Sequence, residues 1–159
     1  MVKNACQDCR ECCVFEEDER YFAPLFTKSE KDNVPKAGFK PFKNSDAVFQ
    51  VELVKLGERY VCPYLDTGTH LCGIYRNRPF DCRMWPFIFM KDKDGDTVLA
   101  CFERDMCPSF DKMCDEDFKK LTDATLSWIK EGGILNFLKE HKELIWDYEE
   151  DTITIKKIK

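Results

Sequence analysis

Apolar and polar residues repeat with two different periods along this chain, and the period changes near residue 115. Before that point, partial alternation of apolar and polar side chains predicts short strands, and turns at Gly57, Gly68 and Gly95 separate them. The predicted strands are 47–56, 59–61, 85–91 and 97–102, with a terminal strand at 152–156. Because tight turns join neighbouring segments, we expect these strands to pair as β-hairpins.

Helical spacing accounts for much of the remainder. Thr27 and Glu30 form a capping-box pattern, which predicts a short helix that stops before Pro35. Acidic residues at 115–117 favour the positive end of a longer helix, which the pair Gly132-Gly133 ends. The inward face of this helix is predicted to be Phe118, Leu121, Thr125, Trp128 and Ile129. We also expect a short helix over 134–141, a loop over 38–44, and a short helix or extended segment over 14–26.

The acidic turn at 92–96 is spaced like part of a calcium-binding loop. Asp92, Asp94 and Asp96 stand where an EF-hand has its first ligands, but Thr97 stands where that loop needs a glycine. Apolar strand formers follow, so we interpret the segment as a hairpin turn.

The composition is that of a folded protein with one modest core. Of 159 residues, 43% are hydrophobic and 35% are charged, which excludes a disordered protein. The longest apolar run, residues 84–90, is far short of the ~18 residues that a spanning helix needs. The N-terminus has no apolar signal stretch, so we expect a cytoplasmic protein. The net charge of −5 disfavours nucleic acid, and we expect a protein partner and neither a nucleic-acid nor a membrane partner.

Ten cysteines indicate the chemistry of the chain. Cys6, Cys9, Cys12 and Cys13 form one run, and a C-x2-C step places two sulfurs on one side of a tight turn, as metal ligation requires. The alternative is a disulfide scaffold in an exported protein. Because the cytosol keeps thiols reduced, we favour metal ligation.

Four further cysteines complete a set of eight. Cys62, Cys72 and Cys82 are ten residues apart and lie beside turn signals, so their thiolates can converge while the backbone loops away. Cys107, which Pro108 follows, is the natural eighth. Eight thiolates satisfy two four-ligand sites, either two structural zinc ions or two iron–sulfur clusters.

The adjacent pair Cys12 and Cys13 limits how these ligands are shared. In an extended chain, successive side chains point to opposite faces, so both thiolates would reach one zinc ion only with strain. We therefore expect the pair to serve different sites, or different irons of one cluster. Cys101 and Cys114 are spare ligands or buried thiols, and for Cys114 we favour the buried thiol. His70 is not needed as a ligand.

The motifs around these cysteines resemble those of a known family. Cys6-x2-Cys9-x2-Cys12-Cys13 is followed by Cys62-Pro63-Tyr64-Leu65 and by Cys72-x-Ile74-Tyr75-x2-Arg78-Pro79-x2-Cys82-Arg83-x2-Pro86. Over residues 6–108 this pattern resembles the CxxCxxCC family of zinc- or iron-chelating proteins. The resemblance implies a metal-binding domain whose cysteine cluster is similar to that of the flagellin lysine N-methylases, which are regarded as iron–sulfur proteins.

The same pattern includes Arg78 and Arg83 on either side of Cys82. A four-thiolate site carries surplus negative charge, which a nearby guanidinium can offset by donating to sulfur. The alternative is an ion pair with Asp81 or another surface acid. We predict Arg78 and Arg83 as cofactor-binding residues, and no catalytic residue is identified. The predicted metal ligands are Cys6, Cys9, Cys12, Cys13, Cys62, Cys72, Cys82 and Cys107.

Together these patterns predict an α+β fold, a small irregular cysteine-rich metal-cluster domain with short β-hairpins and a C-terminal helical segment. We expect a cysteine-cluster metal-binding domain over 1–114 and a C-terminal helical extension over 115–159 packed on the same core. The relatives favour one or two iron–sulfur clusters of the [4Fe–4S] type in a redox or cofactor role. The alternatives are a structural zinc-binding interaction module and a cluster-dependent protein-modifying enzyme such as a lysine methylase.

Overall fold

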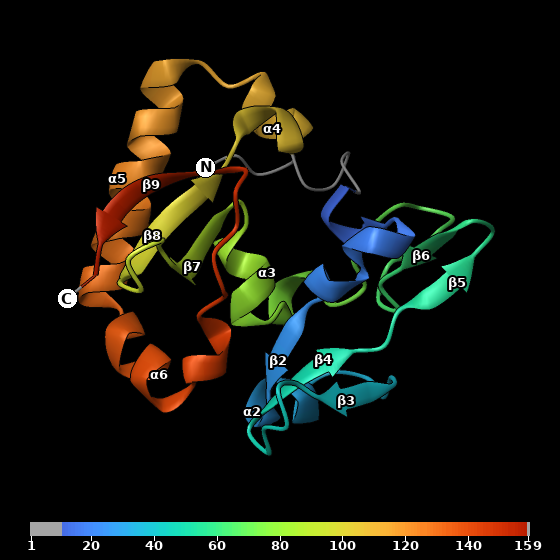
Figure 1. Cartoon of the computed structure of the whole chain (residues 1–159). Helices are drawn as coiled ribbons and strands as arrows, with labels where there is room; N and C mark the ends of the chain where they lie inside the picture. Colours follow the sequence, from blue (N-terminus) through green and yellow to red (C-terminus); the bar gives the residue numbers. More distant parts are fainter. Residues whose placement is uncertain (1–10, 159) are drawn as a thin grey trace. The chain divides into compact units, whose positions relative to one another are not determined.

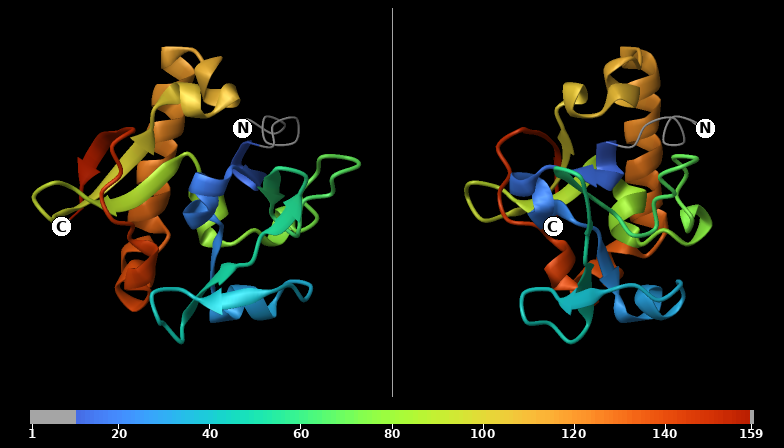
Figure 2. Two further views of the ribbon diagram at one scale, coloured as in Figure 1. Left: turned by 45° about the vertical axis from the view of Figure 1, so that its right-hand side comes forward. Right: turned by 90° about the vertical axis from the view of Figure 1, so that its right-hand side faces the viewer.

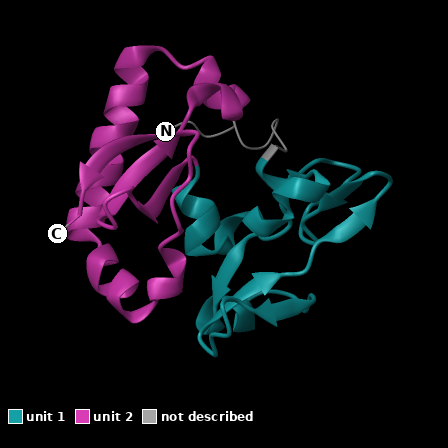
Figure 3. Ribbon diagram, in the orientation of Figure 1, with its two compact units in different colours: residues 1–85 teal, residues 86–159 magenta. Residues whose placement is uncertain are grey.

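The computed structural model describes residues 11–158 and confirms the α+β fold, with helices beside small antiparallel sheets. The chain divides into two compact units, residues 1–85 and 86–159 (Figure 3). We call them unit 1 and unit 2 and describe each by itself. The expected division after residue 114 stays a prediction. None of the helices in the described part of the chain has the length and apolar character needed to cross a membrane.

The described part of unit 1 contains two three-stranded antiparallel sheets (Figures 1 and 2). The first sheet has the order β1-β6-β5 and the second has the order β2-β4-β3. The strands are β1 (Val14–Phe15), β2 (Leu25–Thr27), β3 (Phe39–Pro41), β4 (Val48–Val51), β5 (Val54–Leu56) and β6 (Arg59–Val61). The unit also contains the 3-10 turns η1 (Glu11–Cys13), η2 (Glu17–Phe22) and η3 (Tyr75–Asn77) and the helices α2 (Lys28–Asp32) and α3 (Phe80–Met84).

The single strand predicted over 47–56 is wrong, because the structure divides this segment between the two sheets. β4 pairs with β2 and β3 in the second sheet, whereas β5 pairs with β6 in the first. Val48 and Val51 of β4 are buried, and all three residues of β5 are exposed. Apolar residues run through both strands, so the sequence pattern carries no signal for this change of burial.

The loop predicted over 38–44 is also wrong, because residues 39–41 form the edge strand β3. Pro41 has no amide hydrogen to donate, and an edge strand tolerates this loss. Because proline is uncommon in strands, the sequence pattern predicted a loop here.

The helix predicted from the capping box is confirmed as α2. The amide of Glu30 donates to Oγ1 of Thr27 at 3.3 Å, and the amide of Thr27 donates to Oε2 of Glu30 at 2.9 Å. Residues 14–26 contain both alternatives that were open for them, since the 3-10 turn η2 precedes the strand β2.

Unit 2 is built on an antiparallel sheet of order β7-β8-β9, which confirms the second hairpin and the terminal strand. Its elements are β7 (Phe87–Lys91), β8 (Thr97–Phe102), η4 (Arg104–Met106), α4 (Pro108–Asp111), α5 (Asp115–Glu131), α6 (Ile134–Glu140), η5 (Lys142–Leu144) and β9 (Thr152–Lys157). α5 lies along one face of the sheet (Figures 1 and 2), where Phe118 stacks on Phe87 with ring centroids 6.5 Å apart. The inward face predicted for α5 is confirmed, because its five residues are buried or partly buried.

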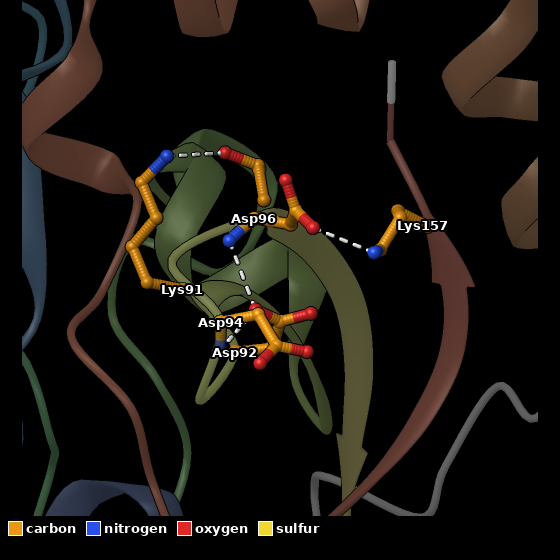
Figure 4. Close-up of polar contacts among 6 residues, drawn as sticks. Lys91, Asp92, Asp94, Asp96 and Lys157 are labelled. Carbon is orange, nitrogen blue, oxygen red and sulfur yellow. Dashed lines mark hydrogen bonds and ion pairs between the residues drawn. The ribbon is translucent and has the colours of Figure 1, made fainter.

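Asp92 organises the turn between β7 and β8 (Figure 4). Its Oδ1 accepts hydrogen bonds from the amides of Asp94 and Asp96, both at 2.9 Å, and Gly95 adopts a φ of +85°. Nζ of Lys157 on β9 lies 2.6 Å from Oδ2 of Asp96. The acidic segment is therefore a hairpin turn, as interpreted, and one carboxylate also joins it to the neighbouring strand.

Candidate metal centre

Unit 1 carries five of the predicted ligands within the described residues. Cys12 and Cys13 lie in η1, Cys62 follows β6 directly, Cys72 forms an isolated bridge with Leu65, and Cys82 lies in the middle of α3. The predicted ligands Cys6 and Cys9 lie outside the described residues. The eighth, Cys107, belongs to unit 2.

Cys62 and Cys72 begin turns of the same kind. In each turn the carbonyl oxygen of the cysteine accepts a hydrogen bond from the amide three residues later, at 3.0 Å and 3.2 Å. The two turns are joined because the amide of Gly73 donates to the carbonyl oxygen of Tyr64 at 2.8 Å. A Cβ atom at residue 73 would lie 3.3 Å from that oxygen, so glycine permits the close approach.

Burial and backbone hydrogen bonds shift the pKa values of these two thiols in opposite directions. Burial is the larger influence, and it raises the pKa of the Cys62 thiol to about 11 and the pKa of Cys72 above its usual value. The amides of Tyr64 and Leu65 bond the sulfur of Cys62, and the amide of Ile74 bonds that of Cys72, and each of these bonds lowers the thiol pKa. The metal-free thiols therefore keep their protons at neutral pH, although donors for a thiolate are already in place.

Cys12 and Cys13 do not have the extended backbone that the sequence argument assumed. They lie in the 3-10 turn η1, and their side chains are hydrogen-bonded to each other. This bond, then burial, raises the pKa of Cys12 well above its usual value. The premise of opposed side chains is therefore wrong. The assignment of the two cysteines to different sites or irons stays a prediction.

Four thiols of unit 1 lie close enough to affect one another's ionisation. Burial, then Asp81, raises the pKa of Cys82 well above its usual value, and the other three thiols add to this effect. Every pair within the set interacts electrostatically, and its members are Cys12, Cys62, Cys72 and Cys82. Chain segments up to 70 residues apart thus bring their sulfur atoms into one region.

An apolar cluster surrounds part of this region. Its buried members are Phe26, Val51, Cys62, Tyr64 and Ile74. Cys13 and Cys72 pack against it, together with apolar residues such as Val34 and Leu53. The sulfur atoms consequently lie beside a surface that excludes water, which strengthens electrostatic interactions with any ion held there.

The two predicted arginines occupy different surroundings. Arg78 lies 4.1 Å above the ring of Tyr75, and its Nε donates to the carbonyl oxygen of Tyr75 at 3.1 Å. Its positive charge lowers the pKa of both Cys12 and Cys72. Arg83 places Nη2 3.9 Å from Oε1 of Glu30, which is the ion pair considered as its alternative. Arg78 thus lies close enough to these two thiols to affect their ionisation, and the assignment of Arg78 and Arg83 as cofactor-binding residues stays a prediction.

The remaining cysteines belong to unit 2. Cys101 is buried in β8, where burial and then the neighbouring Cys107 raise its pKa to about 11. Cys107 is buried at the start of α4. Cys114 is exposed at the start of α5, so its interpretation as a buried thiol is wrong. The physical reason is the acidic first turn of α5, because residues 115–117 are exposed and this end of the helix faces solvent.

All eight cysteines in the described part of the chain are free thiols. Within residues 11–158, no group of three or more histidine, cysteine, aspartate or glutamate side chains is arranged so that it could hold a metal ion. The donor set nevertheless fits thiophilic metals, because the gathered sulfurs are of one chemical kind and have amide donors and a guanidinium beside them.

The fold and the gathered thiols define a cysteine-rich metal-binding domain. Residues 5–115 match the family CxxCxxCC, described as "Putative zinc- or iron-chelating domain". This match covers well over half of the chain, so the chain belongs to that family, and the resemblance noted in the sequence is confirmed. A metal-binding role fits both the family and the site. No curated protein and no solved structure matches the chain.

Sequence reasoning missed the backbone groups that serve the sulfur atoms. The amides of Tyr64, Leu65 and Ile74 contribute no side-chain signal, but their spacing after Cys62 and Cys72 could have indicated them. A cysteine that begins a tight turn presents its sulfur to the amides two and three residues later, so Cys-Pro-Tyr-Leu and Cys-Gly-Ile-Tyr were available as evidence.

We expect the metal-free protein to lose stability as the pH rises from about 9 to about 11. The folded-state pKa of Cys62 exceeds its usual value of 9.0. The unfolded chain therefore releases its proton first, and the stabilisation present below pH 9 disappears as pH passes the raised value. For this thiol the effect is about 3 kcal/mol at most. Denaturant unfolding across this pH range measures it.

Two serine variants separate the contribution of the Cys62 thiol from the contributions of other groups that titrate in this pH range. Cys62→Ser should flatten the decline, whereas Cys114→Ser, at an exposed position, should leave it unchanged. Equal pH dependence in both variants would contradict the buried-thiol account.

Proposed function

We propose that this chain holds an iron–sulfur cluster of the [4Fe–4S] type in unit 1 and uses it in a redox or cofactor role. The observation that carries the proposal is membership of a zinc- or iron-chelating family, and the proximity of Cys12, Cys62, Cys72 and Cys82 to one another in unit 1 supports it. Four cysteines are the common ligand set of such clusters. When bound, the cluster would supply one-electron chemistry.

The groups that surround the thiols are of the kind found around iron–sulfur clusters. Amide donors to sulfur and an apolar cluster are the features by which proteins adjust iron–sulfur potentials. Arg78 adds a positive charge that offsets the surplus negative charge of thiolates, and Cys12 and Cys72 both respond to it. These groups belong to the chain itself and would act before any ion arrives.

The proposed ligand list is longer than one centre needs. Cys6 and Cys9 belong to the same run as Cys12, and the eight candidate thiolates are as many as two four-ligand centres need. One or two clusters are therefore proposed.

Structural zinc is the second candidate, and one observation favours it. The turns at Cys62 and Cys72 are of one kind and are joined through Gly73, as pairs of cysteine turns are in closed zinc sites. In that case the metal would contribute folding energy, and the surface would serve an interaction with another protein.

The proposal places the chain in the cytoplasm, where thiols stay reduced and available as ligands. Its redox role requires a partner that donates or accepts electrons, and we propose a protein. The net charge of −5 disfavours a nucleic-acid partner.

The bound metal distinguishes the two candidates. Protein purified without air should be brown and contain iron together with acid-labile sulfide, because the cluster consists of both. A colourless protein that contains zinc and no sulfide would refute the iron–sulfur proposal in favour of the second candidate. Protein that contains neither, and takes up neither on anaerobic reconstitution, would refute both.

Cys82→Ser should remove most of the bound metal, because it deletes one of the four interacting thiols. Loss of a metal that joins distant segments should cost about 2–3 kcal/mol and lower Tm by about 5–10 °C. Metal analysis and thermal unfolding provide the measurement, with Cys114→Ser as the matched control at an exposed cysteine. The ligand assignment is wrong if both variants keep the wild-type metal content and Tm.

Arg78→Met should lower the reduction potential of the cluster by roughly 50 mV, close to a tenfold change in a one-electron equilibrium. The reason is that loss of a positive charge beside Cys12 and Cys72 disfavours the added electron. Arg76→Met, at an exposed arginine of the 3-10 turn η3 two residues before Arg78, is the control and should not shift the potential. An equal shift in both variants would reject the specific role of Arg78.

A further inference from the structure

The helix that carries Cys82 lacks a cap of its own. α3 has only five residues, and Pro79 at its N-cap offers no side-chain acceptor to the first amides. Instead, the amide of Phe80 donates to Oε1 of Glu30 at 2.7 Å. A carboxylate fifty residues earlier in the chain therefore caps this helix.

The same carboxylate already closes the capping box of α2. Its second oxygen, Oε2, accepts from the amide of Thr27 at 2.9 Å, while Oγ1 of Thr27 accepts from the amide of Glu30 at 3.3 Å. A capping box uses one acceptor on the acidic residue. Here each of the two oxygens serves a different helix start. The Glu30 side chain is only 18% exposed, and the guanidinium of Arg83 lies 3.9 Å from Oε1.

A second carboxylate, on α3 itself, accepts a hydrogen bond from the backbone of β2. Oδ2 of Asp81 on α3 accepts from the amide of Leu25 on β2 at 3.0 Å. α3 is thus joined to the β2–α2 segment at two points, through Glu30 and through Asp81, and Cys82 is the next residue. Because so short a helix is marginal by itself, these contacts determine where the Cys82 thiol lies.

We propose that Glu30 is a positioning residue for the metal centre, which caps α3 across the fold and thereby holds Cys82 among the other thiols. The inference rests on the proposed function, because it concerns the geometry of that centre. Groups that orient metal ligands change metal affinity by about 10–100-fold when they are removed. The acidic residue of a local capping box would not have this effect.

Three variants of the full chain separate positioning from helix capping. Thr27→Ala removes the half of the capping box in which Oγ1 accepts from the amide of Glu30, and leaves both bonds to the Glu30 carboxylate. Glu30→Ala removes those two bonds, which come from the amides of Thr27 and Phe80, and leaves the Oγ1 bond. Glu30→Gln retains the side-chain length and one acceptor oxygen, which can serve the amide of Phe80. The probe is cobalt(II), titrated anaerobically into the metal-free protein, because its thiolate charge-transfer absorption reports how many sulfurs bind.

We expect Glu30→Ala to bind cobalt at least about 10-fold more weakly than Thr27→Ala and with reduced thiolate absorption. Glu30→Gln should restore most of the affinity and the wild-type spectrum. Melting temperatures of the metal-free variants supply the structural reference, and Glu30→Ala and Thr27→Ala should differ less in Tm than in cobalt binding. Equal cobalt affinity and spectra in Glu30→Ala and Thr27→Ala would overturn the inference.

Cys82→Ser in the same titration tests the centre itself. If Cys82→Ser binds cobalt like the wild type, the proposed function fails. If Cys82→Ser loses binding while Glu30→Ala matches Thr27→Ala, only the role of Glu30 fails. Should Glu30→Ala not fold, Glu30→Asp takes its place, because a carboxylate one methylene shorter cannot reach both amides. The same tenfold loss is expected of it, and affinity equal to Thr27→Ala would overturn the inference.

Discussion

Unit 1 is organised by the cost of burying several thiols beside one another. Burial raises the pKa of Cys62, Cys72 and Cys82, and each thiol that ionises makes the next ionisation harder. Such a group is stable with protons on sulfur, or with a cation that neutralises the thiolates, and unstable between these states. The amide donors in the two cysteine turns and the charge of Arg78 favour the thiolate form, so the chain is prepared for the cation.

The scaffold around these thiols has little stability of its own. The described strands of unit 1 are no longer than four residues, and the first sheet ends in β5, whose three residues are all exposed. Sheets of this size bury little apolar area, so contacts between distant segments matter more than local structure. The carboxylate of Glu30 and the approach of Gly73 to Tyr64 are contacts of this kind. A metal that joined the same segments would add to them, consistent with membership of a metal-chelating family.

In unit 2, by contrast, burial of apolar side chains stabilises the fold. β7 and β8 are almost entirely buried, and Phe118 of α5 stacks on Phe87 of β7. Cys101 lies within this core as one of its fully buried side chains. Cys114 stands exposed at the start of α5. Cysteines of one chain thus have different surroundings, and the gathering of four thiols distinguishes the group in unit 1 from the buried pair Cys101 and Cys107 of unit 2.

The sequence by itself determined the features that depend on neighbouring residues: the capping box at Thr27, the turn at Asp92 and the spacing of the cysteines. Local period and turn chemistry encode these directly. Only the tertiary structure decided that residues 47–56 would divide between two sheets, that Cys12 and Cys13 would share a 3-10 turn, and that Glu30 would cap a second helix. These outcomes depend on burial and on contacts across tens of residues, because the energy that selects them arises only when remote segments pack together.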